Sequence, residues 1–197
     1  MRLIITFFLF LLCSIKVVGQ QKPLKLSKIK TDELPKEIQQ LNNINGCYYW
    51  KDKNGKNYLI LTNLKQKGKG FLELYHYEQK DTTIKLVTSI KKSKGCEFIL
   101  RYEFFMNSIV LSDLNQNGIG EITIQYKCDC RSDVSPVYKE LIFLENGKVS
   151  KLEGYMNLKF NDKIIEHGHY LNDDDFKTGP AIILKHVKKE WAKYMNE

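Results

Sequence analysis

The sequence lacks the short motifs by which many enzymes are identified. It has no G-x-S-x-G nucleophile elbow, no phosphate-binding P-loop and no H-E-x-x-H zinc motif. Histidine is scarce, with four residues in the chain, and a zinc or copper site built on His167 and His169 has no evident third ligand. We therefore expect a protein that acts without catalysis. The alternative is an enzyme with paired carboxylates, because any two of the 23 acidic residues can meet in a fold.

The chain also lacks an arginine-rich helix and a ladder of aromatic residues. Its 31 basic and 23 acidic residues give a formal charge of +8, but the lysines are scattered over many turns and both ends. This distribution is typical of a solvated surface rather than a nucleic-acid groove, so we expect no nucleic-acid partner. Contact with an anionic envelope surface is the alternative use of the charge.

Residues 1–19 resemble an export signal. One arginine precedes an apolar run from Leu3 to Leu12, and small residues, Val17 and Gly19, close the segment. The run is shorter than the roughly 20 apolar residues of a membrane span, and polar residues follow at once. We expect residues 20–197 to form a single exported domain with no transmembrane segment, located in the periplasm, at the cell surface or outside the cell.

Removal of residues 1–19 takes away Arg2 and Lys16 and no acidic residue, which lowers the formal charge from +8 to +6. Lipidation at Cys13 is a disfavoured alternative, because the residue before a lipidated cysteine is normally small and here it is Leu12.

Four cysteines remain after residue 19, and an even number in an oxidising compartment indicates disulfides. They are Cys47, Cys96, Cys128 and Cys130, which allow three connectivities. A bond between Cys128 and Cys130, two residues apart in a strand-like segment, would be strained. We expect each of them to pair with Cys47 or Cys96. Free buried thiols are the alternative.

Most of the chain has the residue pattern of β-strands. Runs of β-branched and aromatic residues are divided by Gly, Asn and Asp at intervals of about ten residues. Ile122, Ile124 and Tyr126 alternate with polar residues, a pattern typical of half-buried antiparallel strands. Strands are predicted over residues 47–50, 57–62, 71–78, 84–90, 97–105, 108–111, 121–128, 138–144 and 152–160.

Helical spacing appears only near the two ends of the mature chain. A short helix is predicted over Glu33 to Leu41, and a closing amphipathic helix follows Pro180, with Ile183, Val187, Trp191 and Tyr194 on one stripe. The fold class is therefore mainly β (α+β): an antiparallel sheet or meander with a short N-terminal helix and a C-terminal amphipathic helix packed on it.

The segment "DLNQNGIGE", residues 113–121, has the oxygen spacing of a calcium loop. Asp113, Asn115 and Asn117 stand at alternate positions, a glycine permits a sharp turn, Ile119 can offer its carbonyl, and Glu121 follows two residues later. The loop resembles the strand-loop-strand calcium loops of FG-GAP and VCBS-type repeats. We predict a weak, structural Ca²⁺ site.

The alternative is that residues 117–118 form a plain Asn-Gly turn, with the neighbouring polar side chains bonded to their own backbone. A second stretch, "DKNGKNYLIL" at residues 52–61, also runs polar residues through Asn-Gly into a strand, like "NQNGIGEITI" at residues 115–124.

The motif "CRSDVSP", residues 130–136, extends the pattern. With the loop before it and "YKELIFLENGK" after it, residues 47–150 resemble small exported Bacteroidetes proteins identified as a surface polysaccharide biosynthesis protein family. The resemblance implies an envelope accessory protein associated with surface polysaccharide or lipopolysaccharide production, which binds a glycan or an assembly protein. The alternative is a periplasmic or surface enzyme that modifies glycans with loop carboxylates.

Overall fold

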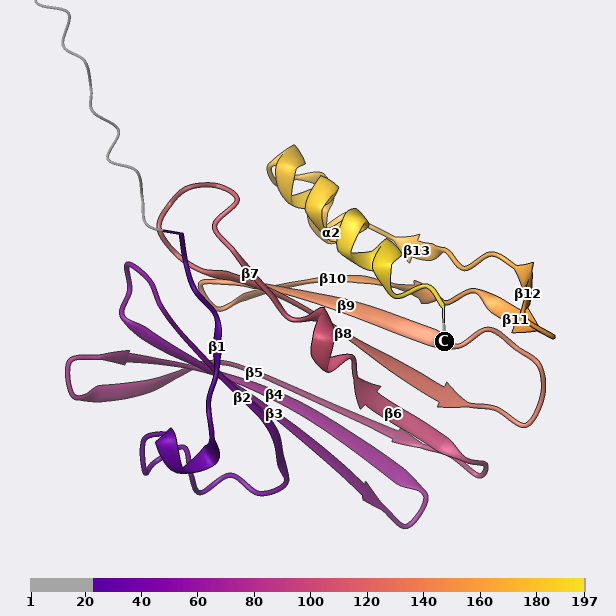
Figure 1. The fold of residues 1–197 in the computed structure, drawn as a ribbon, viewed down its shortest axis with the longest axis horizontal. Coiled ribbons are helices and arrows are strands. Elements are labelled where there is room, and N and C mark those ends of the chain that lie inside the picture. The colour runs from indigo at the N-terminus through magenta and orange to yellow at the C-terminus, as the bar shows by residue number, and fades with distance from the viewer. Residues whose placement is uncertain (1–22, 197) are drawn as a thin grey trace, which may run out of the picture.

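The computed structural model describes residues 23–196, so the predicted export signal and Cys13 lie outside the described residues. The described chain forms two antiparallel sheets (Figure 1). The first has the order β1-β2-β3-β4-β5, and its strands are β1 (Ser27–Lys28), β2 (Ile44–Lys51), β3 (Lys56–Gln66), β4 (Lys69–Lys80) and β5 (Thr83–Gly95).

The second sheet has the order β13-β10-β9-β8-β6, with β7 paired to β8. Its strands are β6 (Leu100–Phe104), β7 (Val110–Ser112), β8 (Glu121–Cys130), β9 (Tyr138–Glu145), β10 (Lys148–Tyr155) and β13 (Tyr170–Asn172). A separate hairpin of β11 (Leu158–Phe160) and β12 (Lys163–Glu166) follows β10. The mainly β, antiparallel fold class is confirmed. Each predicted strand overlaps an observed one, but the strand predicted over residues 152–160 is divided between β10 and β11, and the strand predicted over residues 97–105 begins only at Leu100.

The main core lies between the two sheets, because alternate residues of each strand point toward the facing sheet. Leu59, Leu61 and Leu74 of the first sheet pack in one buried cluster with Ile122 and Ile124 of the second. Ile122 and Ile124 therefore face the core as predicted, but β8 is not half-buried, since Thr123 and Gln125 on its other face are buried as well.

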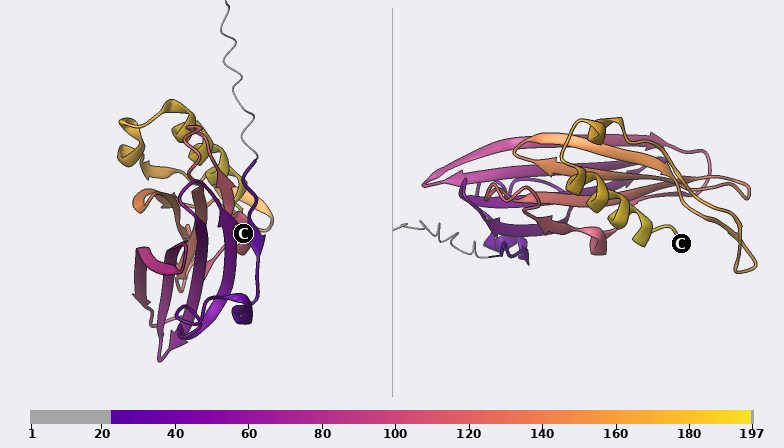
Figure 2. Two further views of the ribbon diagram at one scale, coloured as in Figure 1. Left: turned by 90° about the vertical axis from the view of Figure 1, so that its left-hand side faces the viewer. Right: turned by 90° about the horizontal axis from the view of Figure 1, so that it is seen from above.

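The closing helix α2 (Ala181–Lys193) covers the outer face of the second sheet (Figures 1 and 2). The predicted stripe is confirmed for Ile183, Val187 and Trp191, which are buried against a cluster that includes Leu141 and Phe143 of β9. Tyr194, the fourth predicted member, follows the last residue of the helix and is only partly buried. A short helix, α1 (Asp174–Lys177), precedes α2. No helix within residues 23–196 is long and apolar enough to cross a membrane.

The predicted helix over Glu33 to Leu41 is wrong in length and type. The structure has a 3-10 helix, η1 (Thr31–Glu33), followed by a turn in which the Ile38 and Gln39 amides donate to the carbonyl of Pro35. Pro35 fixes its own φ and disfavours helical geometry in the residue before it, so a continuous helix cannot pass through this point. The apolar residues still serve the core, since Ile38 is buried on the outer face of the first sheet.

The polar connection at residues 161–179 contains structure that the sequence pattern did not predict. It carries β12, β13 and α1, and a second 3-10 helix, η2 (Met106–Ser108), lies between β6 and β7. Residues 65–70 form the predicted turn, although β3 and β4 extend farther into it than expected.

Candidate functional site

The loop between β7 and β8 is curled by its own side chains. The Asp113 carboxylate accepts a hydrogen bond from the Gly118 amide at 3.1 Å. Asn115 Oδ1 accepts one from the Asn117 amide at 3.1 Å, and Asn117 Oδ1 accepts one from the Ile119 amide at 2.7 Å. The turn needs a positive φ at Gly118, where φ is +81°. These contacts are the ones that the plain turn requires, and a calcium loop is compatible with them.

Two carboxylate oxygens of the loop distinguish it from a plain turn. Glu121 is fully buried, and its Oε2 accepts hydrogen bonds from Ser112 Oγ and the Leu114 amide at 2.8 Å each. The other oxygen, Oε1, has no donor, and the same is true of Asp113 Oδ1, which is also buried. Burial raises the pKa of the Glu121 carboxyl. A buried carboxylate oxygen without a donor is costly, so each of these two oxygens is suited to contact with a cation.

Glu145, at the end of β9, is part of the site and was missed by the sequence analysis. Its Oε1 accepts hydrogen bonds from the side-chain amides of Asn115 and Asn117. It is the cross-strand partner of Glu121, and its charge also raises the pKa of that carboxyl. The Glu-Asn-Gly turn at residues 145–147 is visible in the sequence, but only the pairing of β8 with β9 shows that it lies beside the loop.

The loop between β2 and β3 supports the site from the other sheet. Asp52 Oδ2 accepts hydrogen bonds from the Gly120 amide at 2.9 Å and from Trp50 Nε1 at 3.1 Å. The Lys53 amide donates to the carbonyl of Gly118 at 2.8 Å. The two Asn-Gly stretches that resemble each other in sequence are therefore in direct contact.

The predicted ligands lie in one loop, but within residues 23–196 no three His, Cys, Asp or Glu side chains gather as a metal-binding group. The loop itself offers two carboxylates, from Asp113 and Glu121, with two amides and the carbonyl of Ile119 completing the predicted set. A hard cation accepts all three kinds of oxygen, so the residues fit calcium, and the calcium site stays a prediction.

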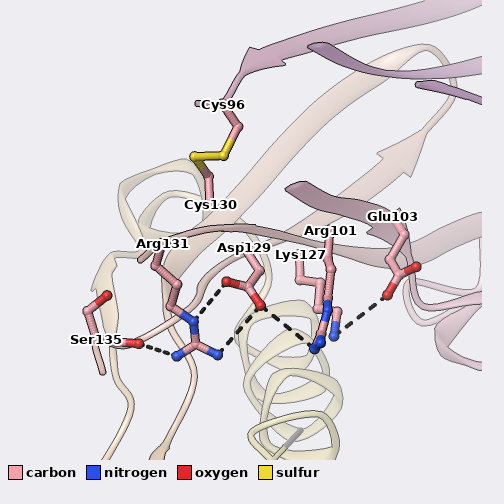
Figure 3. Close-up of polar contacts among 8 residues, drawn as sticks. All are labelled: Cys96, Arg101, Glu103, Lys127, Asp129, Cys130, Arg131 and Ser135. Carbon is pink, nitrogen blue, oxygen red and sulfur yellow. Dashed lines mark hydrogen bonds and ion pairs between the residues drawn. A yellow bond between two sulfur atoms is a disulfide. The ribbon is translucent and has the colours of Figure 1, made fainter. Parts of the chain in front are cut away.

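The opposite end of the sandwich is closed by a disulfide between Cys96 and Cys130 (Figure 3). Cys47 and Cys128 are free thiols, so the expectation of a second bridge is wrong. Cys47 packs on the outer face of the first sheet, whereas Cys128 packs against the core between the sheets, which separates the two thiols.

The "CRSDVSP" segment forms a loop that is held by its arginine (Figure 3). Arg131 Nε donates to Asp129 at 2.8 Å, and Arg131 Nη1 donates to the carbonyl of Ser135. Asp129 is buried, and Arg101 approaches it from β6 at 4.0 Å. The motif therefore serves to fix the connection between β8 and β9.

A cavity of about 390 Å³ lies beside this loop, between the sheets. Its walls carry the free thiol of Cys128 and four tyrosines, namely Tyr102, Tyr126, Tyr138 and Tyr155. Next to it, the buried Glu140 accepts hydrogen bonds from Tyr126 Oη at 2.8 Å and Tyr138 Oη at 3.2 Å. Lys92 Nζ lies 3.1 Å from the same carboxylate. Burial raises the pKa of Tyr102 to about 12, and it also raises the pKa of Tyr126 and of Tyr138, so these three phenols stay protonated at neutral pH.

A second carboxylate adjoins this network. Glu153 is the cross-strand neighbour of Glu140, and Tyr138 Oη lies 2.9 Å from its Oε2. The two acids thus share one phenol beside the cavity. The carboxylates of the enzyme alternative lie in loops instead, and the loop that follows β7 is at the other end of the sandwich from the loop that follows β8 (Figure 1).

The chain was compared with family models, curated proteins and solved structures. No family model, no curated protein and no solved structure matches the chain.

Proposed function

We propose that this chain is an exported accessory protein of the bacterial envelope, which acts by binding and whose fold is stabilised by a weakly held calcium ion. The observation that carries the proposal is the pair of buried oxygens, Asp113 Oδ1 and Glu121 Oε1, that lack a donor. A Ca²⁺ ion between them supplies the positive charge that the loop does not contain, and the loop's amide and carbonyl oxygens complete its coordination.

The affinity follows from the charge of the loop. Only Asp113 and Glu121 bring full charges to the predicted ligand set, because amides replace carboxylates at the other two side-chain positions. The dissociation constant is therefore expected at about 10⁻⁴ to 10⁻³ M, in the range of extracellular calcium modules.

The export and binding parts of the proposal have separate support. The Cys96–Cys130 disulfide suits an oxidising compartment, in agreement with the signal-like residues 1–19. The resemblance to the surface polysaccharide family supports an envelope glycan or an assembly protein as the partner. The tyrosine-walled cavity supports the glycan, since aromatic faces stack on the apolar faces of sugars.

A calcium titration of residues 20–197 by isothermal calorimetry tests the ion site. We expect saturable binding by the wild-type chain and none by Glu121→Gln, because the amide removes the charge that faces the ion. Asp81→Asn, in the exposed β4–β5 turn, is the matched control and should bind as the wild type does. Absence of binding in the wild-type chain, or equal binding by Glu121→Gln, would contradict the proposal.

The paired carboxylates favour one second candidate, a glycan-modifying enzyme. Glu140 and Glu153 share the Tyr138 phenol beside the cavity, and paired acids are the groups that glycoside hydrolysis uses. A panel of nitrophenyl glycosides assayed with the wild type and with Glu153→Gln tests it. Turnover that the substitution abolishes would support the enzyme. Absence of turnover with every glycoside of the panel would favour the binding function instead.

A further inference from the structure

Four turns come together at the end of the sandwich that carries the disulfide (Figures 1 and 2). They are residues 65–69, 94–101, 129–136 and 158–166, called the disulfide end below. Cys96 is bonded to Cys130, and its amide donates to the carbonyl of Gly68 at 2.9 Å. Ile99, Val134 and Lys159 line one open groove of about 360 Å³, which joins three of these turns.

The disulfide end holds most of the exposed apolar side chains of the described residues. Six of the eleven exposed large hydrophobics are in its turns: Phe98, Ile99, Val134, Phe160, Ile164 and Ile165. Ile99 is the most exposed of all, with 81% of its surface accessible. None of the eleven lies in residues 52–55, 81–82, 113–120 or 146–147, the turns of the opposite end. Apolar side chains gathered at loop tips in this way indicate an interaction surface.

Basic residues surround these apolar tips. Seven exposed cations belong to the disulfide end, namely Lys65, Lys67, Lys69, Lys94, Arg101, Lys159 and Lys163. Its exposed acids are four, namely Glu97, Asp133, Asp162 and Glu166. An excess of cations around aliphatic side chains complements an anionic lipid bilayer, where the cations meet headgroups and the apolar groups enter the acyl boundary. Protein interfaces, in contrast, are depleted of lysine.

We propose that the disulfide end docks on an anionic lipid surface. Ile99 and Val134, at the tips of two turns joined by the disulfide, enter the bilayer boundary, and the lysines of the β3–β4 turn and the β11–β12 hairpin contact the headgroups. The disulfide holds the apolar tips together for this contact. The inference is independent of the calcium site, which lies at the other end of the sandwich (Figure 1).

The test is sedimentation of residues 20–197 with lipid vesicles. The protein should bind vesicles that contain phosphatidylglycerol, bind less at high salt, and not bind phosphatidylcholine alone. The double variant Ile99→Asp, Val134→Asp should lose at least tenfold in affinity. The matched control, Leu86→Asp with Ile182→Asp, adds the same charge at similarly exposed apolar positions outside the disulfide end and should stay within about threefold of the wild type.

A charge reversal gives a second arm. Lys159→Glu with Lys163→Glu should weaken binding by at least tenfold, since each lysine near such a surface contributes a factor of about five. Lys53→Glu with Lys80→Glu, in the β2–β3 turn and at the end of β4 on the opposite side of the sandwich, should have a much smaller effect. The inference is overturned if the wild type does not bind the anionic vesicles, or if control and test variants bind alike. Self-association in gel filtration that only Ile99→Asp, Val134→Asp removes, without vesicle binding, would assign the surface to a second copy instead.

Discussion

Lys139 Nζ donates a hydrogen bond to the carbonyl oxygen of Trp191 at 2.8 Å and lies 4.1 Å from the centre of a ring of the same residue. It also donates to the carbonyl of Tyr194 at 2.8 Å, so a fully buried ammonium caps the C-terminal end of α2. A cation at this position interacts favourably with the helix dipole. It adds a second donor to the Trp191 carbonyl, which also accepts a hydrogen bond from the Tyr194 amide at 3.3 Å. This contact fastens α2 to β9.

The capping contact predicts a stability change in mild alkali. Burial lowers the pKa of Lys139 from 10.5 to about 7, so the unfolded chain binds more protons than the folded chain between these values. The free energy of unfolding therefore rises with pH in this window, by up to about 1.4 kcal/mol per pH unit. Urea unfolding between pH 7 and 9 should show this rise in the wild type and not in Lys139→Met. Equal slopes in both proteins would refute it.

His76 predicts a loss of stability in mild acid. Its Nε2 lies 2.9 Å from Asn57 Oδ1, its ring stacks on Trp50, and burial lowers its pKa from 6.5 to about 4. The unfolded state binds more protons between these values, so stability falls as the pH drops from 6.5 to 4. His76→Gln should flatten this part of the profile relative to the wild type. The exposed His167→Gln is the control and should leave the profile unchanged.

Gly120 predicts a steric requirement at the contact between the two Asn-Gly loops. A Cβ at this position would lie 2.5 Å from Trp50 Nε1 and 2.8 Å from a methyl group of Leu111. Gly120→Ala should therefore displace the indole, lower stability by about 1–3 kcal/mol, and change tryptophan fluorescence. Gly95→Ala is the control, since a Cβ there has no neighbour within 4 Å. Native fluorescence and stability in Gly120→Ala would contradict the packing described.

The disulfide predicts a specific pattern of thiols. Cys96 and Cys130 are 34 residues apart, and closing a loop of this length stabilises the folded state by about 3–4 kcal/mol. Cys130→Ala should lower the free energy of unfolding by this amount, and Cys128→Ala by less. A thiol assay on denatured, unreduced residues 20–197 should count two free thiols. A count of zero would mean that Cys47 and Cys128 are bonded as well.

The strands were predictable because their signal is local. The alternation of apolar and polar residues over 122–126 indicates which side of the strand faces the core. The apolar stripe of Ile183, Val187 and Trp191 indicates a helix that packs on a sheet. The local sequence does not show what covers the other face of β8. Thr123 and Gln125 have the alternation of solvent-facing residues, yet both are buried because α2 lies over them.

The ion loop was recognised from its own spacing, but its surroundings were not. Glu145 and Asp52 reach the loop through strand pairing and sheet packing, which one sequence does not reveal. The acid pair of Glu140 and Glu153 has the same origin, since the two residues meet only across β9 and β10. The prediction of a second disulfide was wrong for a related reason. Whether two cysteines lie on the same side of a sheet depends on how the sheets pack, and Cys47 and Cys128 lie on different sides.

The calcium site is tested most directly by thermal unfolding of residues 20–197 in EDTA and in saturating Ca²⁺, beside Glu121→Gln. With calcium at a hundredfold excess over the dissociation constant, the wild type should gain about 2.7 kcal/mol, which raises the melting temperature by about 5–10 °C. Glu121→Gln should show no shift, and in EDTA it should be at least as stable as the wild type, because it removes a buried charge that has no counter-ion. Identical melting temperatures of the wild type in EDTA and in calcium would contradict the account and leave the loop as a turn.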